Sequence, residues 1–280
     1  MFGWWEFGGA GGGAVRSVLG IDAAWTTKNP SGVALVAETS NGWELIRVAG
    51  SYSEFVNPEN PHQSDKNKYQ SCNVNELLRV CNDLLDDPVE LIAIDMPLSF
   101  APINARRVAD DSVSAMYARN WCATHSPNCD RPGAVGQRLY DQLTLAEYPL
   151  MTERISGRGM IEVYPHPALV ELMGTEKRLP YKHSKMRNYW PDHSPEERRV
   201  ELRKVWHEIL IAMERRILGI AECLDAGAEF QRGSEWKRFE DILDAIVCAF
   251  VGICALDGLA VPLGNVEAAI WIPTNGGLKA

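Results

Sequence analysis

The order of apolar and polar segments along the chain predicts several short strands near its start. Apolar runs at 17–24 and 89–95 are too short for helices and rich in β-branched residues, which indicates buried strands. Residues 32–48 contain two further runs on either side of the turn pair Asn41 and Gly42, a pattern that favours an antiparallel hairpin. The chain is therefore expected to open with a small mixed sheet.

Apolar residues recur at helical spacing in three later segments. The first segment begins at Asn73, a residue type that caps helices. The second begins with a capping box formed by Ser194 and Glu197, and its apolar face is predicted to extend to Leu224. The third segment, 239–256, is apolar nearly all round, which is typical of a buried helix.

Strands and helices alternate in a way that predicts an α/β fold, with a mixed sheet of one antiparallel hairpin and parallel strands flanked by helices. Further strands are expected at 159–164 and 268–272, and about 101–156 is predicted to be a helical or irregular insertion. Residues 1–16 are interpreted as a flexible Gly-rich leader. We expect 17–280 to form a single domain, because no shift in composition marks a second one.

Composition excludes several classes of protein. The 280 residues are 46% hydrophobic and 23% charged, an ordinary globular mixture that argues against collagen-like, disordered and coiled-coil chains. No stretch approaches the ~20 consecutive apolar residues that a membrane span needs. The start has no basic region followed by an apolar core, and seven cysteines are an odd number that fits reduced thiols. These features predict a cytoplasmic protein with no membrane partner.

Charge narrows the choice of partner. The formal net charge is -9 at pH 7, from 37 acids and 28 bases. Non-specific affinity for nucleic acid comes from clustered Lys and Arg, so the acid excess argues against a generic basic nucleic-acid binder. Any contact with phosphates is therefore expected to be localised or weak.

Five acidic residues lie where stability alone would not place them. Asp22 and Asp95 each end an apolar strand, and ligands of open α/β sheets gather at the carboxyl ends of strands. Asp241 and Asp244 are three residues apart and share one face of the last helix, while Glu162 lies inside an apolar strand. Buried carboxylates that converge repel one another unless a cation is present, and all-oxygen ligands suit Mg²⁺ or Mn²⁺.

Simpler explanations exist for most of these acids. An Asp after a strand is often only a turn former, which applies to Asp22 and Asp95 taken singly. An acid in the first turn of a helix complements the helix dipole, which would explain Glu240 and also Asp241. Asp244 resists this explanation because apolar residues flank it on both sides. The combination therefore carries more weight than any one residue.

Seven motifs spread along the chain resemble the successive motifs of a known family. In order, they are Gly20-Ile-Asp22-Ala-Ala-Trp25, Ile94-Asp-Met-Pro-Leu-Ser99, Arg107 with Asp110, Glu162-Val-Tyr-Pro-His166, Tyr181-Lys182 with Arg187, Asp241-x-x-Asp-Ala-x-x-Cys-Ala249 and Glu267-Ala-Ala-Ile-Trp-Ile-Pro273. The family is domain of unknown function 429, a predicted nuclease family with an assigned RNase H-like fold. The resemblance covers about residues 17–273, and the last helix is also similar to the closing motif of RuvC-type resolvases.

That resemblance implies a metal-dependent nuclease that hydrolyses phosphodiester bonds by a two-metal mechanism. Asp22 would bridge two Mg²⁺ or Mn²⁺ ions, Asp95 and Asp244 would each hold one, and Asp241 would be a further ligand. Glu162 would be a ligand or a base that orients water. The expected partner is nucleic acid or another phosphodiester.

Basic residues of the same motifs are candidates for contact with substrate phosphate. These are Lys182, Arg187 and Arg107, with Arg106 as a neighbour of the last. A solvated surface role is the simpler explanation for each, because Lys and Arg are mostly exposed.

Other interpretations remain open. The acids could be vestiges in a non-catalytic nucleic-acid or protein interaction module of the same fold. An ATPase of the actin-like or sugar-kinase type is disfavoured, because Ala23 and Ala24 stand where such proteins place a Gly and a hydroxyl residue after the first-strand Asp. Cys122, His125 and Cys129 offer three zinc ligands without a clear fourth, so free thiols are favoured over a structural zinc site.

Overall fold

A computed structural model describes residues 15–59 and 73–274 of the chain. The predicted leader lies almost wholly outside these residues. Within them, no helix is both long enough and apolar enough to cross a membrane.

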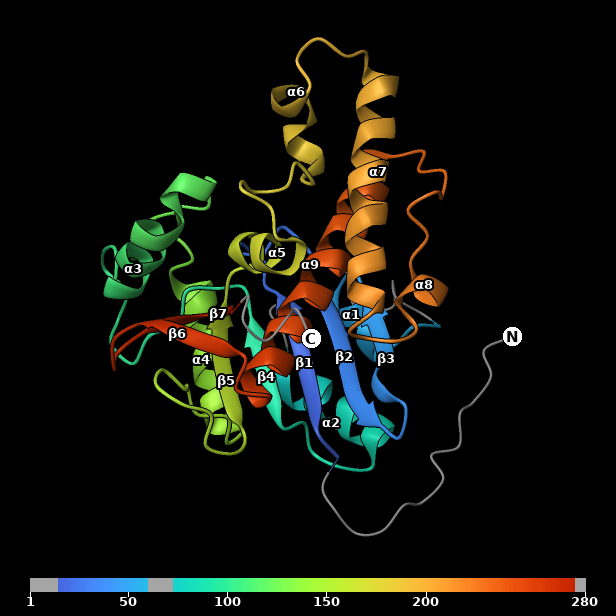
Figure 1. Ribbon diagram of the computed structural model, residues 1–280. Coiled ribbons are helices and arrows are strands. Elements are labelled where there is room, and N and C mark those ends of the chain that lie inside the picture. Colours follow the sequence, from blue (N-terminus) through green and yellow to red (C-terminus); the bar gives the residue numbers. More distant parts are fainter. Residues whose placement is uncertain (1–14, 60–72, 275–280) are drawn as a thin grey trace.

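One seven-stranded sheet forms the centre of the described fold (Figure 1). Its strands run in the spatial order β3-β2-β1-β4-β5-β7-β6. The strand bounds are β1 Ser17–Asp22, β2 Gly32–Thr39, β3 Gly42–Ala49, β4 Leu91–Ile94, β5 Gly159–Val163, β6 Ala260–Gly264 and β7 Ala269–Pro273. The four central strands β1, β4, β5 and β7 are parallel, and antiparallel pairs close both edges. The mixed sheet confirms the predicted α/β fold class.

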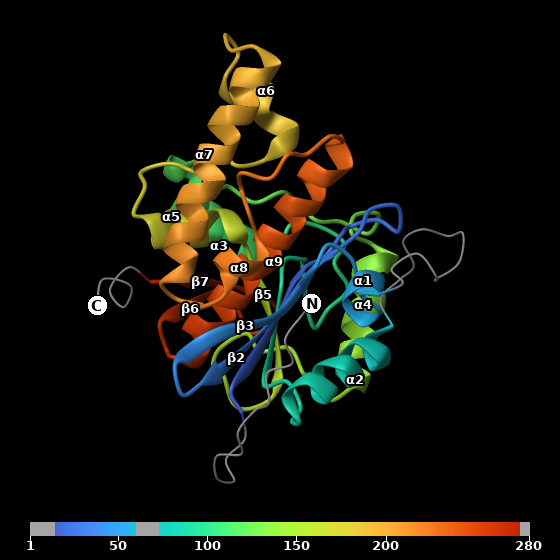
Figure 2. The same ribbon diagram turned by 90° about the vertical axis from the view of Figure 1, so that its right-hand side faces the viewer.

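Helices cover both faces of the sheet. Their bounds are α1 Tyr52–Val56, α2 Val74–Leu85, α3 Val108–Tyr117, α4 Ala134–Leu145, α5 Pro165–Met173, α6 Met186–Tyr189, α7 Pro195–Glu214, α8 Ile220–Cys223 and α9 Gly233–Leu256. Figure 2 shows α1, α2 and α4 on one side of the sheet and α5, α7 and α9 on the other. Alternate residues of β1 serve the two layers: Val18 packs with α9, and Leu19 and Ile21 pack with α2.

Helix α9 lies directly against the strands because two glycines leave room for it. A Cβ on Gly20 of β1 would collide with the backbone of Ala245, and a Cβ on Gly32 of β2 would collide with the backbone of Asp241. A larger residue at either position would push the helix away from the sheet. The glycines therefore set how closely the acidic turn of α9 approaches the end of β1.

Replacing Gly20 with alanine is expected to lower the free energy of unfolding by about 2–3 kcal/mol, because the added methyl group overpacks a rigid backbone contact. Urea denaturation measures the change. Gly233→Ala is the matched control, because a Cβ there meets nothing closer than His183 Cε1 at 3.9 Å. Equal stability of the two variants would contradict this view of the helix contact.

Several predicted boundaries are wrong. Helix α7 ends at Glu214, so Leu224 is not on its face but follows the short helix α8. Helix α9 begins at Gly233, six residues before the predicted start, because its first turns are mostly polar apart from the buried Trp236 and Phe239. Strand β6 and helix α1 were not predicted. The expected insertion, 101–156, contains α3 and α4 joined by irregular chain.

Candidate acidic site

Asp22 and Asp95 leave the sheet side by side. Asp22 ends β1 and Asp95 follows β4, and these two strands are parallel neighbours. The backbone N–H of Asp95 donates to the carbonyl of Ile21 at 2.9 Å, which extends the pairing to the point where both side chains emerge. Within the described parts of the chain, neither of these two carboxylates accepts a hydrogen bond.

Helix α9 brings Asp241 and Asp244 to the same place. The Asp244 side chain is completely buried, and Asp241 is 2% exposed. Burial, followed by the charge of Asp244, raises the pKa of Asp22 well above its usual range, and Asp241 and Asp95 add to the effect. The same two causes raise the pKa of Asp95 to about 7. The four predicted aspartates therefore share one electrostatic environment.

Two lysines balance part of this negative charge. The Lys182 ammonium group pairs with Asp244 and lies 3.6 Å from Glu240 Oε1. Lys237 pairs with Asp241, one helical turn away on α9, and lies 3.4 Å from the same Glu240 oxygen. Five carboxylates, those of the four aspartates and Glu240, thus face two ammonium groups. The cluster keeps an excess of negative charge.

Hydrogen bonds orient the carboxylates that the lysines contact. The Tyr181 hydroxyl donates to Asp244 Oδ1 at 2.7 Å, and the backbone N–H of His183 donates to Glu240 Oε2 at 2.6 Å. Tyr181 is itself held, because its carbonyl accepts the indole N–H of Trp206 at 2.8 Å. The segment that starts at Tyr181 is therefore fixed to α9 through two of the acids.

The donor set suits a hard divalent cation, although the described residues contain no group of three His, Cys, Asp or Glu side chains already placed to hold a metal ion. Asp241 Oδ2 is buried and has no hydrogen-bond partner among the described residues. Asp22 and Asp95 likewise offer carboxylate oxygens that no hydrogen bond uses. Mg²⁺ or Mn²⁺ would satisfy the buried oxygen of Asp241, the partly exposed carboxylates of Asp22 and Asp95, and the excess of negative charge. The ammonium groups of Lys182 and Lys237 neutralise only part of this negative charge.

Glu162 differs from the other predicted acids because its charge is fully paired. Its two oxygens accept bonds from the Arg107 guanidinium at 2.6 and 2.7 Å, and Oε2 also accepts the backbone N–H of Leu98 at 2.7 Å. Arg107 also contacts Asp110 at 2.9 Å, and its side chain is only 8% exposed. The Arg107 guanidinium is therefore held in two buried ion pairs.

The other predicted basic residues take different positions. Lys182 is part of the acidic site, with 20% of its side chain exposed. Arg187 is exposed on α6, which together with one end of α7 extends beyond the sheet in Figure 1. Arg106 contacts Asp111 at 2.6 Å and Ser114 Oγ at 2.6 Å, so it stabilises α3. Of these predicted bases, Lys182 is the one that pairs with an aspartate of the acidic site.

Sequence reasoning missed Tyr181, Lys237 and Glu240 as members of the site. The simpler explanation of Glu240, and of Asp241 taken alone, as acids of a first helical turn is wrong, because α9 begins two turns earlier. The spacing of Lys237 and Asp241, four residues apart, is the one sequence signal that could have placed this lysine.

Cys122, His125 and Cys129 lie in the chain that follows α3. Cys122 is buried, burial raises its pKa to about 11, and its thiol donates to the carbonyl of Asn120. Cys129 is an exposed free thiol. Neither cysteine forms a disulfide, and within the described ranges no three metal-binding side chains are grouped to hold an ion.

Asp95 gives the site a measurable dependence on pH. Its pKa is raised from 3.8 in the unfolded chain to about 7, so the folded protein binds more protons between these values and stability falls as pH rises through them. We expect a loss of about 2 kcal/mol from pH 4 to 7, reduced from the full linkage value by partial solvent access. Urea denaturation in the presence of a chelator measures the free energy of unfolding of wild type and Asp95→Asn at each pH. If this free energy changes equally with pH in both proteins, the account of Asp95 is contradicted.

Comparison with known proteins places the chain in a family. No curated protein and no solved structure matches it. A family model, described as protein of unknown function (DUF429), matches residues 20–268, which include all four aspartates of the site. The chain therefore belongs to the DUF429 family.

Proposed function

We propose that this protein is a metal-dependent hydrolase of phosphodiester bonds, with nucleic acid as its expected substrate. The observation that carries the proposal is the convergence of Asp22, Asp95, Asp241 and Asp244 at the carboxyl end of two parallel strands, with an excess of negative charge. Such an excess costs stability unless it serves a cation. We also propose, as part of this function, that the α/β fold is of the RNase H-like type.

The four aspartates are the residues that would hold Mg²⁺ or Mn²⁺. Bound divalent ions supply an activated water and stabilise charge on the leaving oxygen of a phosphodiester. Lys182, next to Asp244, would contact a phosphate oxygen of the substrate. Tyr181 keeps Asp244 in one orientation, and Glu162 does the same for the chain that follows Asp95, because it binds Leu98 N–H directly. Glu162 and Arg107 are thus positioning residues in this proposal.

A second candidate function is a non-catalytic interaction module. The observation that favours it is the pairing of Lys182 with Asp244 and of Lys237 with Asp241, which neutralises two of the carboxylates within the protein itself. In a protein that binds no metal ion, these two lysines would offset the repulsion between the neighbouring carboxylates. The two candidates differ in whether the site takes up divalent ions and cleaves.

The test is cleavage by the purified wild-type protein with Mg²⁺ or Mn²⁺ and, separately, with a chelator. Single-stranded, duplex, hybrid and branched nucleic acids are the substrates. We expect cleavage of at least one substrate with metal and none with the chelator. If cleavage with the chelator is as fast as cleavage with metal, the metal dependence is contradicted. If every substrate stays intact in every condition, the interaction module is favoured.

A further inference from the structure

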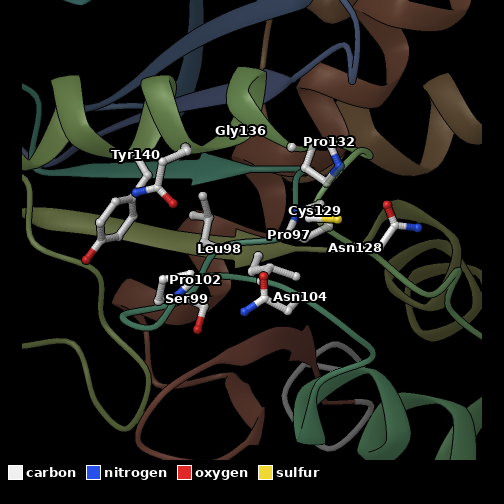
Figure 3. A pocket seen from close by; sticks show the side chains of 13 residues that line it. Pro97, Leu98, Ser99, Pro102, Asn104, Asn128, Cys129, Pro132, Gly136 and Tyr140 are labelled. Carbon is white, nitrogen blue, oxygen red and sulfur yellow. The ribbon is translucent and has the colours of Figure 1, made fainter.

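A cavity of about 200 Å³ lies between the chain that follows β4 and the start of α4. Figure 3 shows its walls, with Leu98, Pro102 and Asn104 on one side and Pro132 and Tyr140 on the other. A cavity of about 150 Å³ can hold a benzene ring, so this one has room for a single ring system and not for a whole nucleotide.

The lining is apolar with neutral polar groups, and none of its 13 residues is Asp, Glu, Lys, Arg or His. Prolines and Leu98 supply flat apolar surface, and Tyr140 adds an aromatic ring. Phosphate is bound by positive charge or converging N–H groups, so this lining does not favour the phosphate of a substrate. The chemistry favours a neutral, planar group that carries hydrogen-bond donors and acceptors.

The polar side chains of the lining offer both kinds of hydrogen-bonding group. Asn128 Oδ1 accepts the backbone N–H groups of Asp130 and Arg131, which leaves its amide NH₂ as a donor. Gln137 donates to Asp141 at 2.9 Å, which leaves its amide oxygen as an acceptor. Asn104, within the described parts of the chain, has no hydrogen-bond partner for its side chain. Donors and acceptors of this kind match the edge of a nucleobase.

The cavity is joined to the acidic site by short stretches of chain. Pro97 in its wall is two residues after Asp95. A Cβ on Gly136, also in the wall, would lie 3.1 Å from the sulfur of Met96, so α4 packs against the residue that follows Asp95. The Arg131 guanidinium lies 5.7 Å from the ring centroid of Trp25, three residues after Asp22.

We propose that this cavity binds one unstacked nucleobase of the substrate. The inference rests on the proposed hydrolase function and deepens it, because a base can enter only from a single strand or after leaving a duplex. The protein would hold a base in the cavity and the adjoining phosphodiester at the aspartates. Its substrates would then be single-stranded or locally unpaired nucleic acid.

The experiment is an NMR titration of the wild-type protein with nucleosides, without divalent ions and without phosphate groups. We expect binding with a Kd of about 1 mM, with shifts at residues of the cavity. Asn104→Ala, a change at an exposed residue, and Tyr140→Leu should each weaken binding about tenfold. Thr144→Ala, an exposed change on α4 outside the cavity, is the matched control and should bind as wild type does.

Three results would overturn the base site: no shift with any nucleoside, equal binding of free ribose, or unchanged affinity in both variants. Failure of the base site is distinct from failure of the proposed function. Metal-dependent cleavage without nucleoside binding would remove only the base site. Nucleoside binding without cleavage would support the cavity as a base site and contradict the proposed hydrolase function.

Discussion

Asp22→Asn is expected to lower metal-dependent cleavage by about 10³-fold, since divalent ions supply several kcal/mol of stabilisation to the transition state and the variant would lose them. Asp22 ends β1 and interacts electrostatically with all three other aspartates, so no neighbour can replace it. Asparagine has nearly the same shape but no charge. Initial rates of cleavage at saturating Mg²⁺ or Mn²⁺ measure the effect.

The same substitution should leave the protein folded and slightly more stable in a chelator. Burial and the neighbouring carboxylates raise the pKa of Asp22, so its charged form opposes folding at neutral pH. Asp83→Asn is the matched control, because Asp83 is 62% exposed in a surface pair with Arg79. Undiminished cleavage in Asp22→Asn, or equal loss in Asp83→Asn, would contradict the site assignment.

Arg107→Ala is expected to lower the free energy of unfolding by about 3–5 kcal/mol, because it leaves the buried charges of Glu162 and Asp110 without a cationic partner. The guanidinium also donates to the carbonyl of Leu98 at 2.7 Å, so one residue ties β5, α3 and the chain after Asp95 together. Urea or thermal denaturation measures the change.

A surface pair provides the comparison for Arg107. Arg79→Ala removes an exposed ion pair with Asp83 and should cost less than about 1 kcal/mol. If Arg107 instead served mainly to bind substrate phosphate, Arg107→Ala would weaken substrate binding and leave stability near that of wild type. That outcome would support the contact with substrate phosphate that the family resemblance implies for Arg107.

Periodicity was enough to predict the centre of the sheet. The runs that became β1 and β4 are apolar and β-branched, and each ends at an Asp, so neighbouring parallel strands had to bring Asp22 and Asp95 to one edge. The hairpin followed from Asn41 and Gly42. These features depend on local sequence, which is why they could be predicted.

Contacts between distant parts of the chain could not be predicted in the same way. Lys182 and Asp244 are 62 residues apart, and Arg107 and Glu162 are 55 apart, so only the tertiary fold decides which charges meet. The mostly polar residues at the start of α9 hid where the helix begins, and so Glu240 was expected in its first turn. The four aspartates could be proposed from the sequence, but the ion pair that joins Lys182 to Asp244 could not.

Uptake of divalent ions is the most direct test of the acidic site. Isothermal titration calorimetry with Mn²⁺ would compare wild type with Asp22→Asn and with the surface control Asp83→Asn. We predict binding by wild type and by the control, and an affinity at least about tenfold weaker in Asp22→Asn, as expected when one charged ligand is lost. Absence of Mn²⁺ binding to the wild-type protein, or equal affinity in all three proteins, would contradict a metal-dependent function for these aspartates.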